Sequence, residues 1–139
     1  MNGAADKVKI MAIRNTPNGD EYDKDVALGV YYAVDNGAKV INMSFGKGFS
    51  PHSEWVRDAI AYAAEKDVLI VAAAGNDAKD TDVTSYFPND QLGTGPEVSD
   101  TFIKVGATGP KYGSSIVAGY SNYGKKTVDE NNAKKRKYR

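Results

Sequence analysis

An asparagine that follows the most apolar stretch of the chain is the first candidate for chemistry. Residues 68–74 read Val-Leu-Ile-Val-Ala-Ala-Ala, and Gly75 and Asn76 come directly after them. Small residues and a glycine let the backbone and an amide side chain approach a ligand closely. The carboxamide of Asn76 can donate a hydrogen bond to a developing oxyanion. The alternative, favoured by spacing alone, is an asparagine that caps a turn.

A second small-residue segment, Ser44-Phe45-Gly46, follows another predicted strand. In an open parallel sheet, ligands bind beyond the carboxyl ends of the strands. We therefore expect the functional site of this chain where these two strands end.

The sequence does not identify a nucleophile with a base beside it. His52 is the only histidine, and it lies at the start of a predicted helix, where an exposed or capping role is expected. Ser44 and Ser121 have no identifiable base partner, so neither is assigned as a nucleophile.

The loop after Asn76 is acidic, with Asp77, Asp80 and Asp82 close together. Carboxylates at this density suggest calcium, but the ligand order and the glycine of an EF-hand loop are missing. A solvated loop is the preferred interpretation, with calcium as the alternative, and no metal or cofactor is predicted.

Hydrophobic periodicity predicts the elements that position these residues. One helix is expected from about Tyr22 to Asn36 and a second from Ser50 to about Lys66, with Ser50 as N-cap and Pro51 as the first helical residue. Gly37 is expected as the C-terminal cap of the first helix. Strands are predicted at Val8 to Ile13, Lys39 to Met43, Val68 to Ala74, Phe102 to Ala107 and Ile116 to Tyr120.

The alternation of strands and helices predicts an α/β fold, a three-layer α/β/α arrangement with a mainly parallel sheet. The fully apolar stretch at 68–74 is typical of a central strand covered on both faces. Residues 75–100 are polar and are expected to be irregular, and a loop of this length is more often functional than idle.

Composition excludes several classes of protein. Lys plus Arg and Asp plus Glu number 18 each, so the net charge is zero and a dedicated nucleic-acid binder is not expected. The absence of cysteine excludes disulfides, thiolate nucleophiles and cysteine-ligated zinc. No apolar run approaches the roughly 20 residues that span a bilayer, so no membrane helix is expected.

The end of the chain differs in character, because residues 133–139 read Ala-Lys-Lys-Arg-Lys-Tyr-Arg. A solvated, disordered tail over residues 130–139 is the preferred interpretation, and contact with an anionic partner is the alternative.

Two of these segments, Val40 to Gly46 and Val71 to Asn76, resemble the internal strand motifs of the subtilisin-like serine proteases, the subtilases of peptidase family S8. Lys9 to Arg14 resembles the strand that precedes them in the family. Further similarity follows in the family's order, at Tyr86-Phe87-Pro88, Ile103 to Ala107 and Ser121 to Gly124. The resemblance runs from about Val8 to Asp129, and motifs in the same order make it specific. It implies an incomplete subtilisin-like fold, with residues 1–129 forming part of the catalytic domain.

The resemblance also implies roles for individual residues. Asn76 matches the asparagine of the family's oxyanion hole. Two segments match the walls of the primary specificity pocket, namely Ser44, Phe45 and Gly46 on one side and Ala73, Ala74 and Gly75 on the other. A substrate peptide would pair with such segments by strand addition, and a pocket beside Phe45 favours an apolar residue before the scissile bond.

The motifs that carry the family's catalytic Asp, His and Ser are not present in the 139 residues. The first hypothesis is therefore a fragment of a serine endopeptidase that binds peptide or protein substrate but is inactive alone. The alternative is a non-catalytic peptide-binding module, or one half of a split protease that self-associates through open sheet edges. A nucleotide-binding domain is set aside, because no glycine-rich phosphate motif follows the first predicted strand. Members of the family are mostly secreted, which is the only indication of location.

Overall fold

The computed structural model of the chain describes residues 5, 7–16, 18–91, 95–110 and 116–124. Its elements are α1 (Asp23–Asp35), β1 (Val40–Met43), α2 (Ser53–Glu65), β2 (Leu69–Ala73) and β3 (Phe102–Val105). The three strands form one parallel sheet in the order β1-β2-β3. The predicted α/β fold with a parallel sheet is confirmed, and β2 is its central strand.

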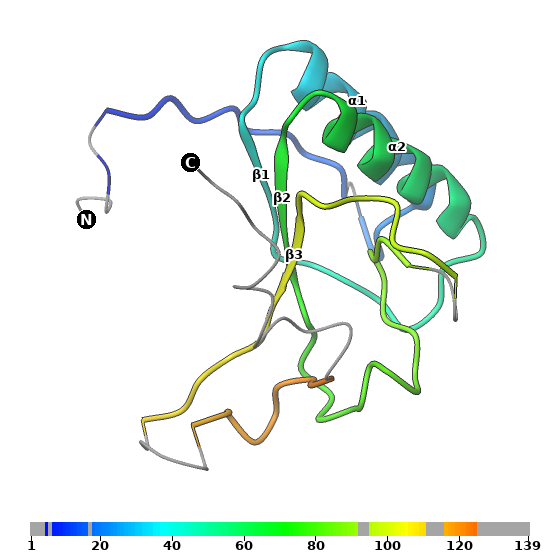
Figure 1. Cartoon of the computed structure of the whole chain (residues 1–139), viewed down its shortest axis with the longest axis vertical. Helices are drawn as coiled ribbons and strands as arrows, with labels where there is room; N and C mark the ends of the chain where they lie inside the picture. Colours follow the sequence, from blue (N-terminus) through cyan, green and yellow to red (C-terminus); the bar gives the residue numbers. More distant parts are fainter. Residues whose placement is uncertain (1–4, 6, 17, 92–94, 111–115, 125–139) are drawn as a thin grey trace.

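Both helices pack against each other on one face of this sheet (Figure 1). Their apolar stripes share one core with the sheet side chains Met43, Ile70, Ala72 and Phe102. The helix residues in this core are Val26, Ala27, Val30 and Val34 on α1 and Val56, Ala59, Ile60 and Ala63 on α2. Burial of this apolar surface is the main contribution to the stability of the fold.

The opposite face of the sheet carries Leu69, Val71 and Ala73, which are all half-buried, and Ile103 and Val105 of β3. Residues paired in a parallel ladder point to the same side, and Val71 pairs with Ile103 and Ala73 with Val105. The second helical layer of the predicted three-layer arrangement does not occur among the described residues, so this apolar face has no helix on it there.

Two predicted strands are not formed. Val8 and Ile10 are 64% and 90% exposed, and the segment from Val8 to Ile13 belongs to no sheet. Val117 makes a single bridge with Thr108, and Ile116 to Tyr120 is otherwise irregular. An apolar run becomes a buried strand only where a neighbouring strand pairs with its backbone. Within the described part of the chain, Val8 to Ile13 has no such neighbour, and the pairing of Ile116 to Tyr120 is limited to the backbone hydrogen bonds of Ile116 with Gly109 and of Ala118 with Ala107.

The second helix begins later than predicted, at Ser53 with His52 as N-cap. The hydroxyl of Ser50 instead donates a hydrogen bond to the carboxylate of Asp23, at 2.7 Å. The predicted cap at Gly37 is confirmed by its φ of 84°. No helix among the described residues is long and apolar enough to cross a membrane.

Candidate functional site

The ends of β1 and β2 bring the two predicted pocket segments to one edge of the sheet. Met43 pairs with Ala72, so Ser44 and Ala73 leave the ladder side by side. Below, "the 44–46 wall" denotes Ser44, Phe45 and Gly46, and "the 73–75 wall" denotes Ala73, Ala74 and Gly75. Asn76 directly follows the 73–75 wall. The structure therefore brings together all of the site residues that the sequence predicts.

Asn76 is exposed, and its side chain takes part in no hydrogen bond within the described part of the chain. A turn-capping asparagine would donate to or accept from the neighbouring backbone. The carboxamide of Asn76 does neither with the described residues, so none of them occupies its two N–H groups.

The capping role belongs to Asn122, which is 1% exposed. Its side-chain oxygen accepts hydrogen bonds from the backbone N–H groups of Asp77 and Lys79, both at 3.0 Å. Its side-chain nitrogen donates to the carbonyl of Ala74 at 2.9 Å. Asn122 thus holds the backbone on both sides of Asn76. Sequence reasoning placed Asn122 in a family motif but assigned it no role.

The close approach of Asn122 to this backbone requires a glycine at position 75. Its φ of 105° is a conformation that side chains with a Cβ rarely adopt. A Cβ at this position would also lie 2.3 Å from the side-chain nitrogen of Asn122.

Ser44, Ser121 and His52 make contacts within the fold. The Ser121 hydroxyl is buried, accepts from the Ala107 N–H and donates to the Asn122 carbonyl, both at 2.9 Å. The Ser44 hydroxyl accepts from the side chain of Asn42 at 2.9 Å. His52 stacks on Trp55, with 4.1 Å between ring centroids. None of the hydrogen bonds in the described part of the chain joins a serine to His52.

The segment that contains Tyr86 packs against both walls. A Cβ built on Gly46 would lie 2.6 Å from Cε1 of Tyr86, and one built on Gly75 would lie 2.6 Å from Cζ. Burial raises the pKa of the Tyr86 phenol, and the charges of Asp77 and Glu21 add to this effect. The Tyr86 ring therefore sits between the two strand ends.

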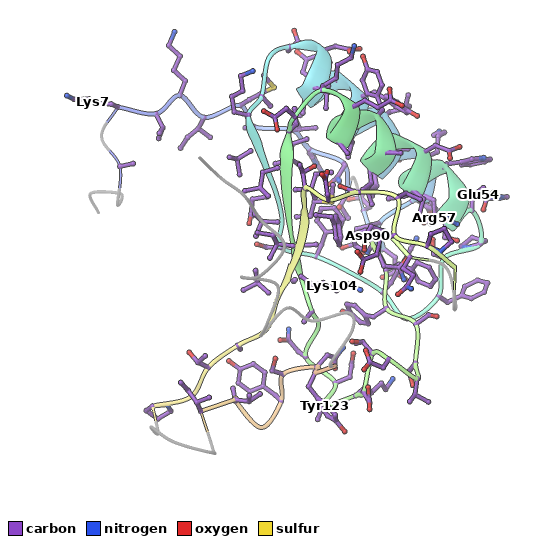
Figure 2. All side chains as sticks on the ribbon, in the orientation of Figure 1. Lys7, Glu54, Arg57, Asp90, Lys104 and Tyr123 are labelled. Atoms are coloured by element: carbon purple, nitrogen blue, oxygen red, sulfur yellow. The ribbon has the colours of Figure 1, made fainter. Side chains whose placement is uncertain are left out.

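A buried lysine on β3 holds this segment in place. Lys104 is 4% exposed, and its ammonium donates a hydrogen bond to the carbonyl of Tyr86 at 2.8 Å. Burial lowers the pKa of Lys104 to about 8, although the nearby carboxylate of Asp90 opposes the change. Figure 2 shows Lys104 on the sheet and Asp90 in the loop beside it.

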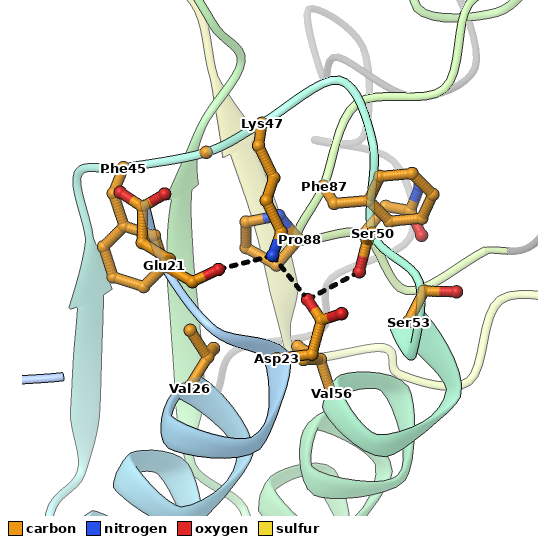
Figure 3. Close-up of a pocket in the computed structure, with 12 residues that line it drawn as sticks. Glu21, Asp23, Val26, Phe45, Lys47, Ser50, Ser53, Val56, Phe87 and Pro88 are labelled. Carbon is orange, nitrogen blue, oxygen red and sulfur yellow. Dashed lines mark hydrogen bonds and ion pairs between the residues drawn. The ribbon is translucent and has the colours of Figure 1, made fainter. Parts of the chain in front are cut away.

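A second lysine joins the 44–46 wall to the first turn of α1 (Figure 3). Nζ of Lys47 lies 2.8 Å from Oδ1 of Asp23 and also donates to the carbonyl of Glu21. Burial raises the pKa of Asp23, but hydrogen bonds from Lys47, Ser50 and the His52 N–H outweigh it, so the pKa lies below its usual value. Sequence reasoning missed this pair, because its members lie on different elements.

One carboxylate of the acidic loop accepts a hydrogen bond from the backbone of the same loop. Oδ1 of Asp80 accepts a hydrogen bond from the backbone N–H of Asp82 at 2.9 Å. Among the described residues, no three His, Cys, Asp or Glu side chains are grouped as they would be around a metal ion. The predicted basic tail at 130–139 lies outside the described residues.

Comparison with known proteins agrees with this geometry. The model of the subtilase family matches residues 1–136. The chain belongs to the subtilase family. It is 40% identical over 126 residues to the cell wall-associated protease of Bacillus subtilis (strain 168), and 34% identical over 123 residues to a thermophilic serine proteinase of Bacillus sp. (strain AK1). These alignments cover 90% and 88% of this chain.

Solved structures show the same fold. The prenylagaramide maturation protease PagA superposes with a TM-score of 0.60 at 26% identity, over 81% of this chain. This subtilase chain corresponds to 36% of PagA and to 12% and 27% of the two Bacillus proteases. It therefore spans about a third or less of these proteins and covers only part of a catalytic domain.

Proposed function

We propose that this chain supplies the oxyanion-hole and substrate-binding segments of a serine endopeptidase, which hydrolyses peptide bonds through an acyl-enzyme. The observation that carries the proposal is the free carboxamide of Asn76, exposed beside the ends of two parallel strands. Its position in a subtilase chain, next to the 44–46 and 73–75 walls, supports a role toward substrate.

The proposed role of Asn76 is to stabilise negative charge electrostatically. When a nucleophile attacks a peptide carbonyl, negative charge develops on the carbonyl oxygen, and a fixed N–H donor lowers the energy of that state. Asn122 holds the backbone on both sides of Asn76 through three hydrogen bonds of 2.9–3.0 Å. These bonds fix the backbone that carries the Asn76 side chain, and the loss of an oxyanion donor costs an enzyme about 10²- to 10³-fold in turnover.

Substrate would bind as an extended strand along the 44–46 wall. The wall continues β1, which is an edge strand of the described sheet. Two contacts make it rigid, the ion pair of Lys47 with Asp23 and the paired backbone hydrogen bonds of Lys47 with Phe87, each 2.9 Å long. A rigid edge loses little conformational entropy when a peptide pairs with it.

The proposal assigns the nucleophile and its base to other parts of a complete domain. Asn76 and the walls alone cannot form an acyl-enzyme, so the 139-residue chain is expected not to hydrolyse peptides.

The test combines activity with binding. We expect no cleavage of a fluorogenic peptide and no mass adduct with a fluorophosphonate, whereas an unlabelled extended peptide should shift the backbone amide signals of residues 44–46 and 73–76 in ¹⁵N NMR spectra. A covalent adduct would contradict the assignment of the nucleophile elsewhere. Amide shifts confined to other parts of the chain would contradict the substrate site.

A second candidate is half of a split protease completed by another chain. The specific observation in its favour is the sheet face with Leu69, Val71 and Ala73, on which the described chain places no helix. A concentration-dependent mass in analytical ultracentrifugation would support it, and a monomer at all concentrations would contradict self-association.

A further inference from the structure

Asn-Gly pairs give this chain a chemistry that the proposed function does not use. The sequence contains three of them, Asn2-Gly3, Asn18-Gly19 and Asn36-Gly37, and the first lies outside the described residues. Asparagine is a chemically labile residue. A glycine that follows it has no Cβ, so its backbone nitrogen is open to the side chain that precedes it. The two described pairs differ in whether these groups are already engaged in hydrogen bonds.

In the pair Asn18-Gly19 both groups are unoccupied by the described residues. The pair lies in an exposed bend before α1, and none of the described residues forms a hydrogen bond with the Asn18 side chain or with the N–H of Gly19. Gly19 has a φ of 103°, and a Cβ built on it would meet no atom within 4 Å beyond its chain neighbours. The Asn18 side chain can therefore turn toward the Gly19 nitrogen without breaking a contact to the described chain.

In the pair Asn36-Gly37 both groups are engaged at the end of α1. The side-chain nitrogen of Asn36 donates to the carbonyl of Tyr32 at 2.8 Å. The N–H of Gly37 donates to the carbonyl of Val34 at 3.0 Å. Asn36 is the C-cap of the helix, so both bonds belong to the helix end. A reaction between the side chain and the nitrogen has to break both bonds first, which slows it roughly tenfold or more.

We propose that Asn18 is a site of spontaneous modification, at which its amide becomes a carboxylate through a cyclic imide. The Gly19 nitrogen loses its proton to solvent base and attacks Cγ of Asn18. A bond from Cγ to that nitrogen forms, the Cγ–Nδ2 bond breaks, and Nδ2 leaves as ammonia. Water then opens the imide at one of its two carbonyls, which gives aspartate or isoaspartate. Water is the only co-reactant, and no atom is oxidised or reduced.

The product changes the charge of the loop that leads into α1. This loop already carries Asp20 and Glu21, and one more carboxylate takes the net charge of the chain from zero to minus one. The isoaspartate form also places an additional methylene in the backbone ahead of Glu21, whose carbonyl accepts a hydrogen bond from Lys47.

The experiment follows both pairs in the full 139-residue chain. After incubation in mildly alkaline buffer, cleavage after Lys and Arg separates residues 15–24, with Asn18, from residues 25–39, with Asn36. Mass spectrometry then measures each conversion, and fragment spectra distinguish Asn18 from Asn15. In the folded chain Asn18 should convert roughly tenfold faster than Asn36. The rate should rise with pH, because the attacking nitrogen must lose its proton.

Two comparisons separate the effect of the fold from that of the sequence. In guanidinium chloride the helix end no longer holds Asn36, so the two pairs should convert at similar rates. Asn18→Gln, whose longer side chain would have to close a larger ring, should abolish conversion in residues 15–24. Asn36→Gln, also at an exposed position, is the matched control and should leave that conversion unchanged. An unmodified Asn18 in the folded chain, or equal rates for the two pairs there, would overturn the inference without any variant.

Discussion

Nζ of Lys47 lies 2.8 Å from Oδ1 of Asp23, and this ion pair joins the loop after β1 to the first turn of α1. Asp23 also accepts hydrogen bonds from the Ser50 hydroxyl at 2.7 Å and the His52 N–H at 2.9 Å. One carboxylate that is 5% exposed therefore organises the start of α1, the start of α2 and the 44–46 wall. Its favourable interactions fix the wall before any substrate arrives.

Replacing this carboxylate should destabilise the whole fold. Asp23→Ala removes the carboxylate that accepts from the Lys47 ammonium, the Ser50 hydroxyl and the His52 N–H, and we expect a loss of about 2–4 kcal/mol in the free energy of unfolding. Urea denaturation at pH 7 measures it. Asp58→Ala, at an exposed position of α2, is the matched control and should change stability by less than about 0.5 kcal/mol.

Because of the Asp23 carboxylate, we expect the stability of the chain to fall at acid pH. The pKa of Asp23 is lower in the folded chain than its usual value of 3.8. Its stabilising contribution is therefore complete above about pH 4 and is lost as the pH falls through the lower folded pKa. The stability difference between wild type and Asp23→Ala should therefore stay constant above about pH 4 and shrink between pH 4 and the acid limit of folding. A difference that stays constant below pH 4 as well would show that the charge of Asp23 contributes nothing.

Replacement by alanine should lower the stability of the chain at Asn122 but leave it almost unchanged at Asn76. Asn122→Ala removes three hydrogen bonds from a buried position and should cost about 2–4 kcal/mol, with faster hydrogen exchange at the amides of Asp77 and Lys79. Asn76→Ala removes an exposed side chain without a partner and should change stability by less than about 0.5 kcal/mol. Denaturation and hydrogen exchange measure both variants. A large loss of stability in Asn76→Ala would contradict its assignment to a ligand.

Lys104 should make the chain more stable in mildly alkaline solution. Its pKa is lowered from 10.5 to about 8, so the unfolded chain binds more protons between these values. Stability therefore rises with pH from about 8 upward, until the raised pKa values of Tyr62 and Tyr86 reverse the trend above about 10.

Comparison with a variant isolates this contribution. Lys104→Met keeps the length of the side chain and removes the buried ammonium, so its stability should lack the rise between pH 8 and 10. Lys39→Met, at an exposed position before β1, should keep it. Urea denaturation over this pH range measures all three chains. Parallel curves for wild type and Lys104→Met would mean that Lys104 is not buried as an ammonium.

Local patterns in the sequence determined the helices, the parallel sheet and the two strand ends that carry the site. The apolar positions Val26, Val30, Ile60 and Ala63 were predictable because helical periodicity depends only on neighbours along the chain. Asn76 and the two walls were predictable through the resemblance to subtilases, whose motifs are contiguous.

Only the tertiary structure decided which distant residues contact the strand ends and hold them in place. Asn122 reaches back to Ala74, Tyr86 enters between Gly46 and Gly75, and Asp23 meets Lys47. Each of these contacts joins elements far apart in the chain, so it depends on the path of the irregular loops, which no local periodicity specifies. For the same reason Val8 to Ile13 has the composition of a buried strand but is exposed here, because burial requires a neighbouring strand as well as an apolar sequence.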